Sequence, residues 1–219
     1  MNPRVVAVCV GRAEPIGPAR RGGTAHANGV VRARDAAPGA GGEVRSAIRK
    51  QPVSTLADPR RVELAVDGLW GDEQADLSMH GGPMRAVYMY PADHYAFWST
   101  VREQAKLPAA LPFGALGENL TVEGLRETDL WVGDILEIGQ ARLSVTSPRT
   151  PCWKLDAAMG FSWASRMMIQ SGYTGWYLSV VRQGTVAAGD EVLVHPGDRV
   201  LSVKDRHAMR HRTQQQSLF

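Results

Sequence analysis

The sequence predicts a mainly β chain with helical inserts, folded into a closed or nearly closed β-barrel. Its 219 residues include 23 glycines and 13 prolines, more than the roughly 12% that these types usually contribute, which favours many turns between short strands. Short strand-like segments recur along the chain, without the alternation of strand and helix that is typical of a Rossmann fold. Closure into a barrel would remove the exposed edges that so many strands create.

The expected strands are short apolar or alternating segments. Residues 5–10 are apolar and end at Gly11, which is typical of a buried strand. Residues 46–53 and 61–66 alternate polar and apolar side chains, as half-buried strands do. The other strand-like segments are residues 84–90, 119–122, 134–138, 141–146, 177–181, 191–195 and 199–203.

Two segments have helical spacing. Pro91 is well placed to begin a helix over residues 93–106, where large apolar side chains recur every three residues. Residues 161–170 show a similar spacing of apolar side chains. We therefore expect two helices inserted between the strands.

The length suits one domain, which we place at residues 1–205. Residues 12–42 are rich in Gly, Ala, Pro and Arg and have no hydrophobic period, so we expect a flexible insertion or a functional loop. Residues 206–219 are polar and basic, and we expect a frayed C-terminal tail.

Charge and cysteine content exclude several classes of protein. The net charge of +3, from 25 basic and 22 acidic residues, is too small to predict strong nucleic-acid binding. No run of about 18 apolar residues is present, so no membrane span is expected. Cys9 and Cys152 lie far apart without a CxxC motif, which excludes an all-thiol zinc site but leaves a single disulfide open. The expected compartment is a reducing cytoplasm.

The segment PRTPCWK, residues 148–154, is the most suggestive candidate site. Its prolines restrict φ, so Cys152 lies on a stiff loop. Arg149 and Lys154 can place positive charge near the sulfur and favour the thiolate, which is the nucleophilic and metal-binding form. The alternative is an inert, buried cysteine flanked by surface cations. Cys9 lies in the first apolar strand, and we expect it to be structural.

Two other segments combine glycines with polar side chains. In MHGGP, residues 79–83, His80 precedes Gly81 and Gly82, whose small size lets backbone N–H groups approach an anion or a cofactor. A plain turn is the alternative. Asp72 belongs to an acidic turn upstream, which could simply be solvated. In GEN, residues 117–119, Asn119 either hydrogen-bonds a heterocycle or phosphate or merely leads into a strand.

Lys50 is the remaining candidate. Alternation places it on the same strand face as Ile48. It therefore points either into the barrel mouth, where it would need an anionic partner, or into solvent as an ordinary strand cation.

Taken together, these motifs resemble the MOSC-domain family, in which MOSC is the C-terminal domain of molybdenum cofactor sulfurases. The nearest branch is that of the stand-alone bacterial YiiM-like proteins. The resemblance covers about residues 44–195 and the strand near residues 5–11. Five segments carry it, in the family's order and approximate spacing: SAIRKQPV, GLWGDEQADLSMHGGPMRAVYMYPADHYAFW, PFGALGENLTVEGL, VGDILEIGQARLSV and PRTPCWKL.

The resemblance implies a MOSC-type β-barrel that binds molybdenum cofactor, a pterin dithiolene holding molybdenum, and not pyridoxal phosphate. Cys152 matches the cysteine that ligates the metal, and a soft thiolate suits such a metal. Lys50 and His80 match the lysine and histidine expected beside the metal or the substrate, which makes these three residues the expected catalytic group. The residues that would hold the cofactor are Lys50, Asp72, His80, Gly81, Gly82, Asn119, Arg149 and Lys154.

The resemblance also implies a reaction. YiiM-like relatives reduce N-hydroxylated compounds, such as hydroxylaminopurine base analogues, to amines. The expected function is therefore a molybdenum-dependent oxidoreductase that takes a small N-hydroxylated substrate and receives electrons from a separate reductase. Lys50 or His80 would give a proton to the leaving oxygen.

Three alternatives stay open. They are a non-catalytic carrier or store of the cofactor, a sulfur carrier with a persulfide on Cys152, and a degenerate barrel that binds no metal. Two departures from the family affect the substrate and the redox partner. Residues 12–42 are longer than the corresponding family segment, and after the domain we expect a short basic tail in place of the three-helix extension common in this branch.

Overall fold

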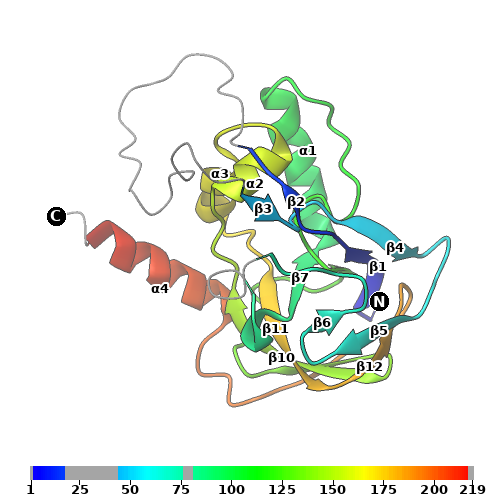
Figure 1. Ribbon diagram of the computed structural model, residues 1–219. Coiled ribbons are helices and arrows are strands. Elements are labelled where there is room, and N and C mark those ends of the chain that lie inside the picture. The colour runs from blue at the N-terminus through cyan, green and yellow to red at the C-terminus, as the bar shows by residue number, and fades with distance from the viewer. Residues whose placement is uncertain (1, 18–43, 76–80, 217–219) are drawn as a thin grey trace.

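The computed structural model describes residues 2–17, 44–75 and 81–216, and its centre is an eight-stranded sheet (Figure 1). β7 and β8 run parallel, and the other neighbouring pairs of this sheet run antiparallel. In spatial order the strands are β13 (Val192–His195), β9 (Ile135–Ile138), β10 (Ala141–Pro148), β11 (Trp176–Arg182), β7 (Val87–Pro91), β8 (Leu120–Glu123), β1 (Arg4–Val10) and β4 (Gln51–Thr55).

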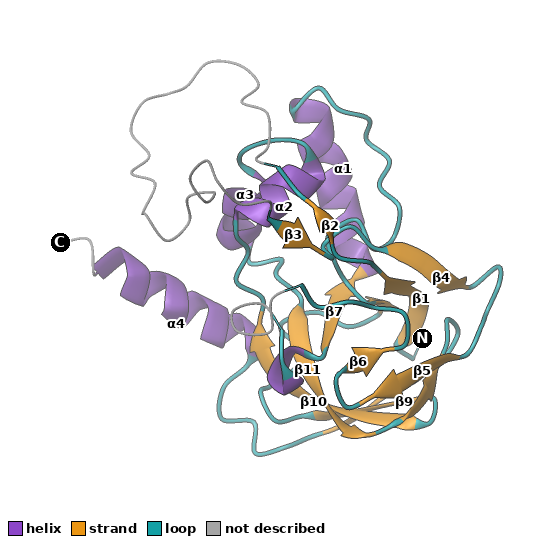
Figure 2. Cartoon of the chain, viewed as in Figure 1, coloured by secondary structure: helices purple, strands orange, loops and turns teal. Residues whose placement is uncertain are grey.

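Two smaller sheets and six helices complete the described residues. One sheet consists of β12 (Gly184–Val186), β5 (Val62–Ala65) and β6 (Gly68–Leu69), and the other of β2 (Glu14–Pro15) and β3 (Arg45–Ser46). Figure 2 shows that α1, α2 and α3 gather at one end of the sheets, whereas α4 projects outward. The helices are η1 (Pro83–Arg85), η2 (Ala92–His94), α1 (Tyr95–Gln104), α2 (Trp153–Met159), α3 (Ala164–Ser171) and α4 (Val203–Gln216).

The mainly β fold is confirmed, but closure into a barrel is not. The large sheet ends at β13 and β4, and no sheet of the described residues closes on itself. The sheet nevertheless curls, because the Val192 N–H donates to the Pro3 carbonyl at 2.8 Å. The Val5 N–H donates to the Asp190 carbonyl at 2.9 Å, beside an isolated bridge between Arg4 and Glu191.

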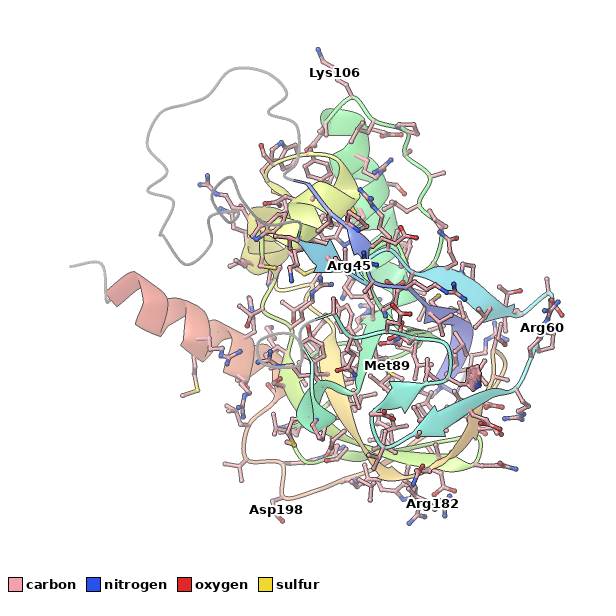
Figure 3. The ribbon with its side chains drawn as sticks, viewed as in Figure 1. Arg45, Arg60, Met89, Lys106, Arg182 and Asp198 are labelled. Carbon is pink, nitrogen blue, oxygen red and sulfur yellow. The ribbon has the colours of Figure 1, made fainter. Side chains whose placement is uncertain are left out.

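Two apolar clusters hold the sheet and the helices together. One fills the inner face of the sheet around Val87, Met89 and Trp176. The other lies between the sheet and α1–α3 and includes Tyr88 and Trp98. Figure 3 shows Met89 inside this body, where burial of apolar surface stabilises the fold.

Several expected elements need correction. The expected strand over residues 46–53 divides into β3 and β4, because the chain bends between them where Gly11 packs closely. A Cβ on Gly11 would lie 2.7 Å from the Arg49 carbonyl oxygen. The expected strand over residues 199–203 is wrong, since Ser202 forms only a bridge with Trp131 and Val203 begins α4.

Three helices were not expected. η1 occupies residues 83–85, at the start of the expected strand over residues 84–90. α2 follows directly after Cys152, in a segment that the prolines suggested was loop. α4 occupies most of residues 206–219, where we expected a frayed tail. Of the expected insertion at residues 12–42, residues 18–42 lie outside the described part of the chain. Within that part, no helix is both long and apolar enough to cross a membrane.

Candidate functional site

Most of the candidate residues meet in one pocket. It opens where the β3–β4 bend, the loop after β10 and the paired strands β7 and β11 come together. The side chains and backbone that line it belong to Ser46, Ala47, Ile48, Lys50, Asp72, Glu73, Gln74, Ala75, Arg85, Ala86, Tyr88, Gly117, Asn119, Arg149, Thr150, Cys152, Lys154 and Tyr177. Segments far apart in the sequence therefore build one site.

Lys50 points inward and is paired with Asp72. The β3–β4 bend carries the Lys50 side chain into the protein, where it is 7% exposed and its Nζ donates to Asp72 Oδ1. Burial lowers the pKa of Lys50 from its ordinary value, and the Asp72 carboxylate opposes that shift. The solvent-facing alternative for Lys50 is thus wrong, and the anionic partner expected for an inward lysine is Asp72.

Hydrogen bonds of Asp72 and Asn119 stabilise the part of the pocket around Lys50. Asp72 Oδ1 also accepts from the Gly11 N–H at 2.8 Å, and Asp72 Oδ2 accepts from Asn119 Nδ2 at 2.8 Å. Asn119 Nδ2 donates further to the Cys9 carbonyl at 3.3 Å, and Asn119 Oδ1 accepts from the Tyr88 N–H at 3.1 Å. These polar atoms hold three strands and Lys50 in register, and the solvated-turn alternative for Asp72 is wrong.

Cys152 lines the same pocket. It is half-buried and free, and its backbone is extended just before α2 begins. Lys154, in the first turn of α2, lines the same pocket. The full burial that the inert alternative expected is therefore wrong for Cys152, and its reactivity stays a prediction. Full burial describes Cys9 instead, which has no exposed surface and whose thiol pKa is raised by burial.

Arg149 is buried next to Cys152 in the chain and begins a row in which two aromatic rings lie between two cations. Its guanidinium donates to the Leu116 carbonyl and lies 4.8 Å from the centre of the Tyr88 ring. Tyr88 lies directly across from Tyr177 in the pairing of β7 with β11, with ring centres 5.3 Å apart. Arg85 lies 5.6 Å from the centre of the Tyr177 ring. Cation–π contacts stabilise the two ends of this row, and a contact between the two aromatic rings stabilises its middle.

Sequence reasoning missed this row. Tyr88 and Tyr177 are ordinary strand residues in the sequence, and the pairing of their strands cannot be read from local pattern. Aromatic residues in two predicted strands could have suggested a cross-strand pair. Arg85, in the apolar segment after the glycines, gave no separate signal.

Glu118 was also missed, although it lies next to Asn119. It has no exposed surface, and burial raises the pKa of its carboxyl group from the ordinary value. The Tyr95 hydroxyl, the Gly114 N–H at 2.7 Å and the Thr121 hydroxyl at 3.1 Å donate to it. It thus fixes the loop behind Lys50 and does not line the pocket.

The HGG segment is described only in part. His80 lies outside the described residues, so its predicted place beside the substrate stays a prediction. The Gly82 N–H donates to Gln74 Oε1 at 2.8 Å, and Gly82 has a φ of 88° before η1. Gly81 and Gly82 do not line the pocket, whereas Gln74 does. In the described structure Gly82 holds Gln74 through this hydrogen bond, and the cofactor-binding roles expected for Gly81 and Gly82 stay predictions.

The charges and donors of the pocket favour an anionic ligand. Four basic and two acidic side chains line it: Lys50, Arg85, Arg149 and Lys154, against Asp72 and Glu73. Among the described residues no group of three or more His, Cys, Asp or Glu side chains could hold a metal ion.

Comparison with known proteins defines the class. The family model of the MOSC domain matches residues 76–193 of this chain. The chain therefore belongs to the MOSC domain family. It is similar to the YiiM proteins within that family. It is 43% identical over 122 residues to YiiM of Escherichia coli strain K12, across 55% of this chain and 53% of that protein.

Two further relatives extend the comparison. The chain is 38% identical over 165 residues to YflK of Bacillus subtilis strain 168, across 75% of this chain and 70% of YflK. It is 37% identical over 153 residues to a Gibberella moniliformis protein named reductase, across 69% of this chain but 26% of that protein.

Solved structures agree with the fold. The crystal structure of Escherichia coli YiiM superposes with a TM-score of 0.59 at 32% identity, across 73% of this chain and 71% of that chain. The crystal structure of Geobacillus stearothermophilus YiiM gives a TM-score of 0.65 across 97% of this chain and 85% of that chain. At 24% identity, the second likeness shows the fold alone.

Proposed function

We propose that this protein binds molybdenum cofactor and reduces N-hydroxylated compounds to amines. The observation that carries the proposal is the meeting of Cys152, Lys50, Arg149 and Lys154 in one pocket of a MOSC-family chain. The likeness to YiiM and to a protein named reductase supports the same class of activity.

The residues of the pocket fit this cofactor. The dithiolene brings two sulfur ligands, so a single half-buried thiol, Cys152, suffices as the protein's own ligand. The excess of basic side chains suits the phosphate group of the cofactor. Because Arg149 and Lys154 flank Cys152 in the sequence and line the pocket, they would hold the cofactor's anionic groups near the metal.

Lys50 is the proposed proton donor. Reduction of R–NH–OH to R–NH₂ and water consumes two electrons and two protons. The cofactor, when bound, supplies the two-electron redox chemistry, and a separate reductase returns the electrons. Burial makes the Lys50 ammonium a stronger acid than a surface lysine, and Asp72 fixes Nζ in the pocket. His80 is the second candidate for this proton.

The activity test uses protein from a host that makes the cofactor, an artificial electron donor and a panel of N-hydroxylated compounds. We expect amine formation by the wild type and its loss in Cys152→Ser. Cys9→Ala is the matched control, because Cys9 has no exposed surface and does not line the pocket, so its thiol is not available as a ligand and the reaction should stay intact.

The rival functions predict other results. Full molybdenum content without amine formation from any compound would identify a carrier or store. An intact mass increased by one sulfur atom on Cys152 would identify a sulfur carrier. Unchanged amine formation in Cys152→Ser would contradict the assignment of the ligand.

A further inference from the structure

The base of α4 is fixed firmly in the fold. Val203, its first residue, has no exposed surface, and its N–H donates to the Leu130 carbonyl at 2.9 Å. The Lys204 N–H donates to the Glu127 carbonyl at 3.1 Å. Glu127 is itself buried and accepts from the Gly175 N–H at 2.7 Å. The helix therefore leaves the body of the protein in a defined direction, as Figure 1 shows.

The middle of α4 contacts the back of the loop that carries Cys152. His207 Nε2 donates to the Ile169 carbonyl of α3 at 2.9 Å, one turn before Arg210. Arg210 then donates through its guanidinium to Thr150 Oγ1 at 2.9 Å. A small hollow between the helix and the loop is lined by Pro148, Arg149, Thr150, Pro151, Ile169, His207 and Arg210.

The ends of this loop are fixed by strand pairing and burial, since Pro148 pairs with Trp176 of β11 and Pro151 is buried, but its backbone has few donors. Pro148 and Pro151 have no N–H group, so two of its residues cannot donate backbone hydrogen bonds. Arg149 holds one end of the loop to Leu116, and the Cys152 carbonyl accepts from the Leu155 N–H at the other end. Thr150 lies between these two attachments and lines the pocket together with Cys152.

We infer that α4 positions Cys152, with Arg210 acting through Thr150 as a positioning residue. An anchored helix that bonds to the middle of a proline-rich loop restricts where the next side chains of that loop can point. The functional meaning of this placement rests on the proposed role of Cys152 as a metal ligand. The placement itself is independent of that role.

The test is the rate at which iodoacetamide alkylates Cys152 in protein prepared without cofactor. The rate is followed by peptide mass spectrometry from about pH 6 to about pH 10, which separates the thiol pKa from the plateau rate of the ionised thiol. Cys9 is the internal control for intact folding. Arg210→Ala should raise the plateau rate for Cys152 roughly three- to tenfold, as expected for loss of one ordinary side-chain hydrogen bond.

Lys204→Ala is the matched control. It removes one positive charge from the same helix, while the backbone bond of Lys204 to Glu127 remains. It should leave the plateau rate unchanged, and Arg210→Lys should restore part of the wild-type rate. Equal plateau rates in wild type and Arg210→Ala would overturn the inference, as would an equal increase in Lys204→Ala. Wild-type protein that alkylates as expected but never binds molybdenum would refute the proposed function and leave this inference standing.

Discussion

Replacing Asp72 by Asn tests the buried ion pair at the base of the pocket. The carboxylate accepts from Lys50 Nζ, from the Gly11 N–H and from Asn119 Nδ2, and the pair is almost fully buried. Removing one partner of such a pair costs about 3–5 kcal/mol, because a buried charge is left uncompensated. Lys50 could instead lose its proton. At about pH 7 this costs about 1.4 kcal/mol for each unit below a pKa of about 10.4, or about 5 kcal/mol in all. Both routes therefore predict that Asp72→Asn lowers the free energy of unfolding by about 3–5 kcal/mol.

The pH dependence has a definite sign. Asp72 is the group that opposes the lowering of the Lys50 pKa by burial, so Asp72→Asn should lower this pKa further. Above the lowered pKa, the folded variant has released a proton that the unfolded chain still holds. The free energy of unfolding then rises with pH until the unfolded lysine also titrates. The stability deficit of the variant should therefore be smaller at about pH 9.5 than at about pH 7.

The assay is urea unfolding followed by circular dichroism at both pH values. Asp58→Asn is the matched control, because Asp58 forms an exposed ion pair with Arg60. The side chains of Asp58 and Arg60 are 63% and 69% exposed. That control should lose less than about 1 kcal/mol. A deficit for Asp72→Asn as small as that of the control, or one that grows with pH, would refute the reasoning.

Two other predictions concern packing and burial. Gly175 has a φ of 58°, and a Cβ there would lie 2.4 Å from the Met89 carbonyl oxygen. Gly175→Ala should lower the free energy of unfolding by about 2–5 kcal/mol. Gly133→Ala is the control and should cost only about 1–2 kcal/mol, because a Cβ there would meet nothing within 4 Å. Equal losses of the two variants in a denaturant titration would contradict this prediction. Native protein should be alkylated at Cys152 and not at Cys9, and urea should make both thiols reactive. Rapid labelling of Cys9 in the native protein would show that its strand is not buried.

The sequence predicted the strands best where a local pattern decides the structure. β1 and β13 are short apolar segments whose ends lie within one residue of their expected positions, whereas β7 begins three residues later than expected, after η1. The expected helix after Pro91 is present as η2 followed by α1. In these segments, residue type and periodicity suffice, because burial on one or both faces of the sheet follows directly from them.

α4 shows where periodicity fails. Its residues are mostly polar, so it has no apolar stripe to reveal a helix. A capping signal was nevertheless present in the sequence Ser202-Val-Lys-Asp205. The Asp205 N–H donates to Ser202 Oγ at 3.0 Å, and the Ser202 hydroxyl donates to Asp205 Oδ2 at 2.7 Å. This pattern, typical of a helix start, could have predicted the helix.

The candidate site was predicted residue by residue but not as an arrangement. Lys50, Asp72 and Asn119 were each singled out, yet their mutual hydrogen bonds join three separate segments of the chain. Alternation put Lys50 on the face of Ile48, but only the bend after β3 shows that it turns inward. Long-range pairing of this kind depends on the packed fold and leaves no trace in the spacing of residues.

The central claim is that Cys152 holds a molybdenum cofactor in this pocket. The most direct measurement is the molybdenum and pterin content of wild type, Cys152→Ser and Cys9→Ala, each purified from a host that makes the cofactor. We predict nearly equimolar molybdenum and pterin in the wild type and in Cys9→Ala, and a large loss of molybdenum in Cys152→Ser. Wild-type protein without either component, or Cys152→Ser with an undiminished molybdenum content, would contradict the claim.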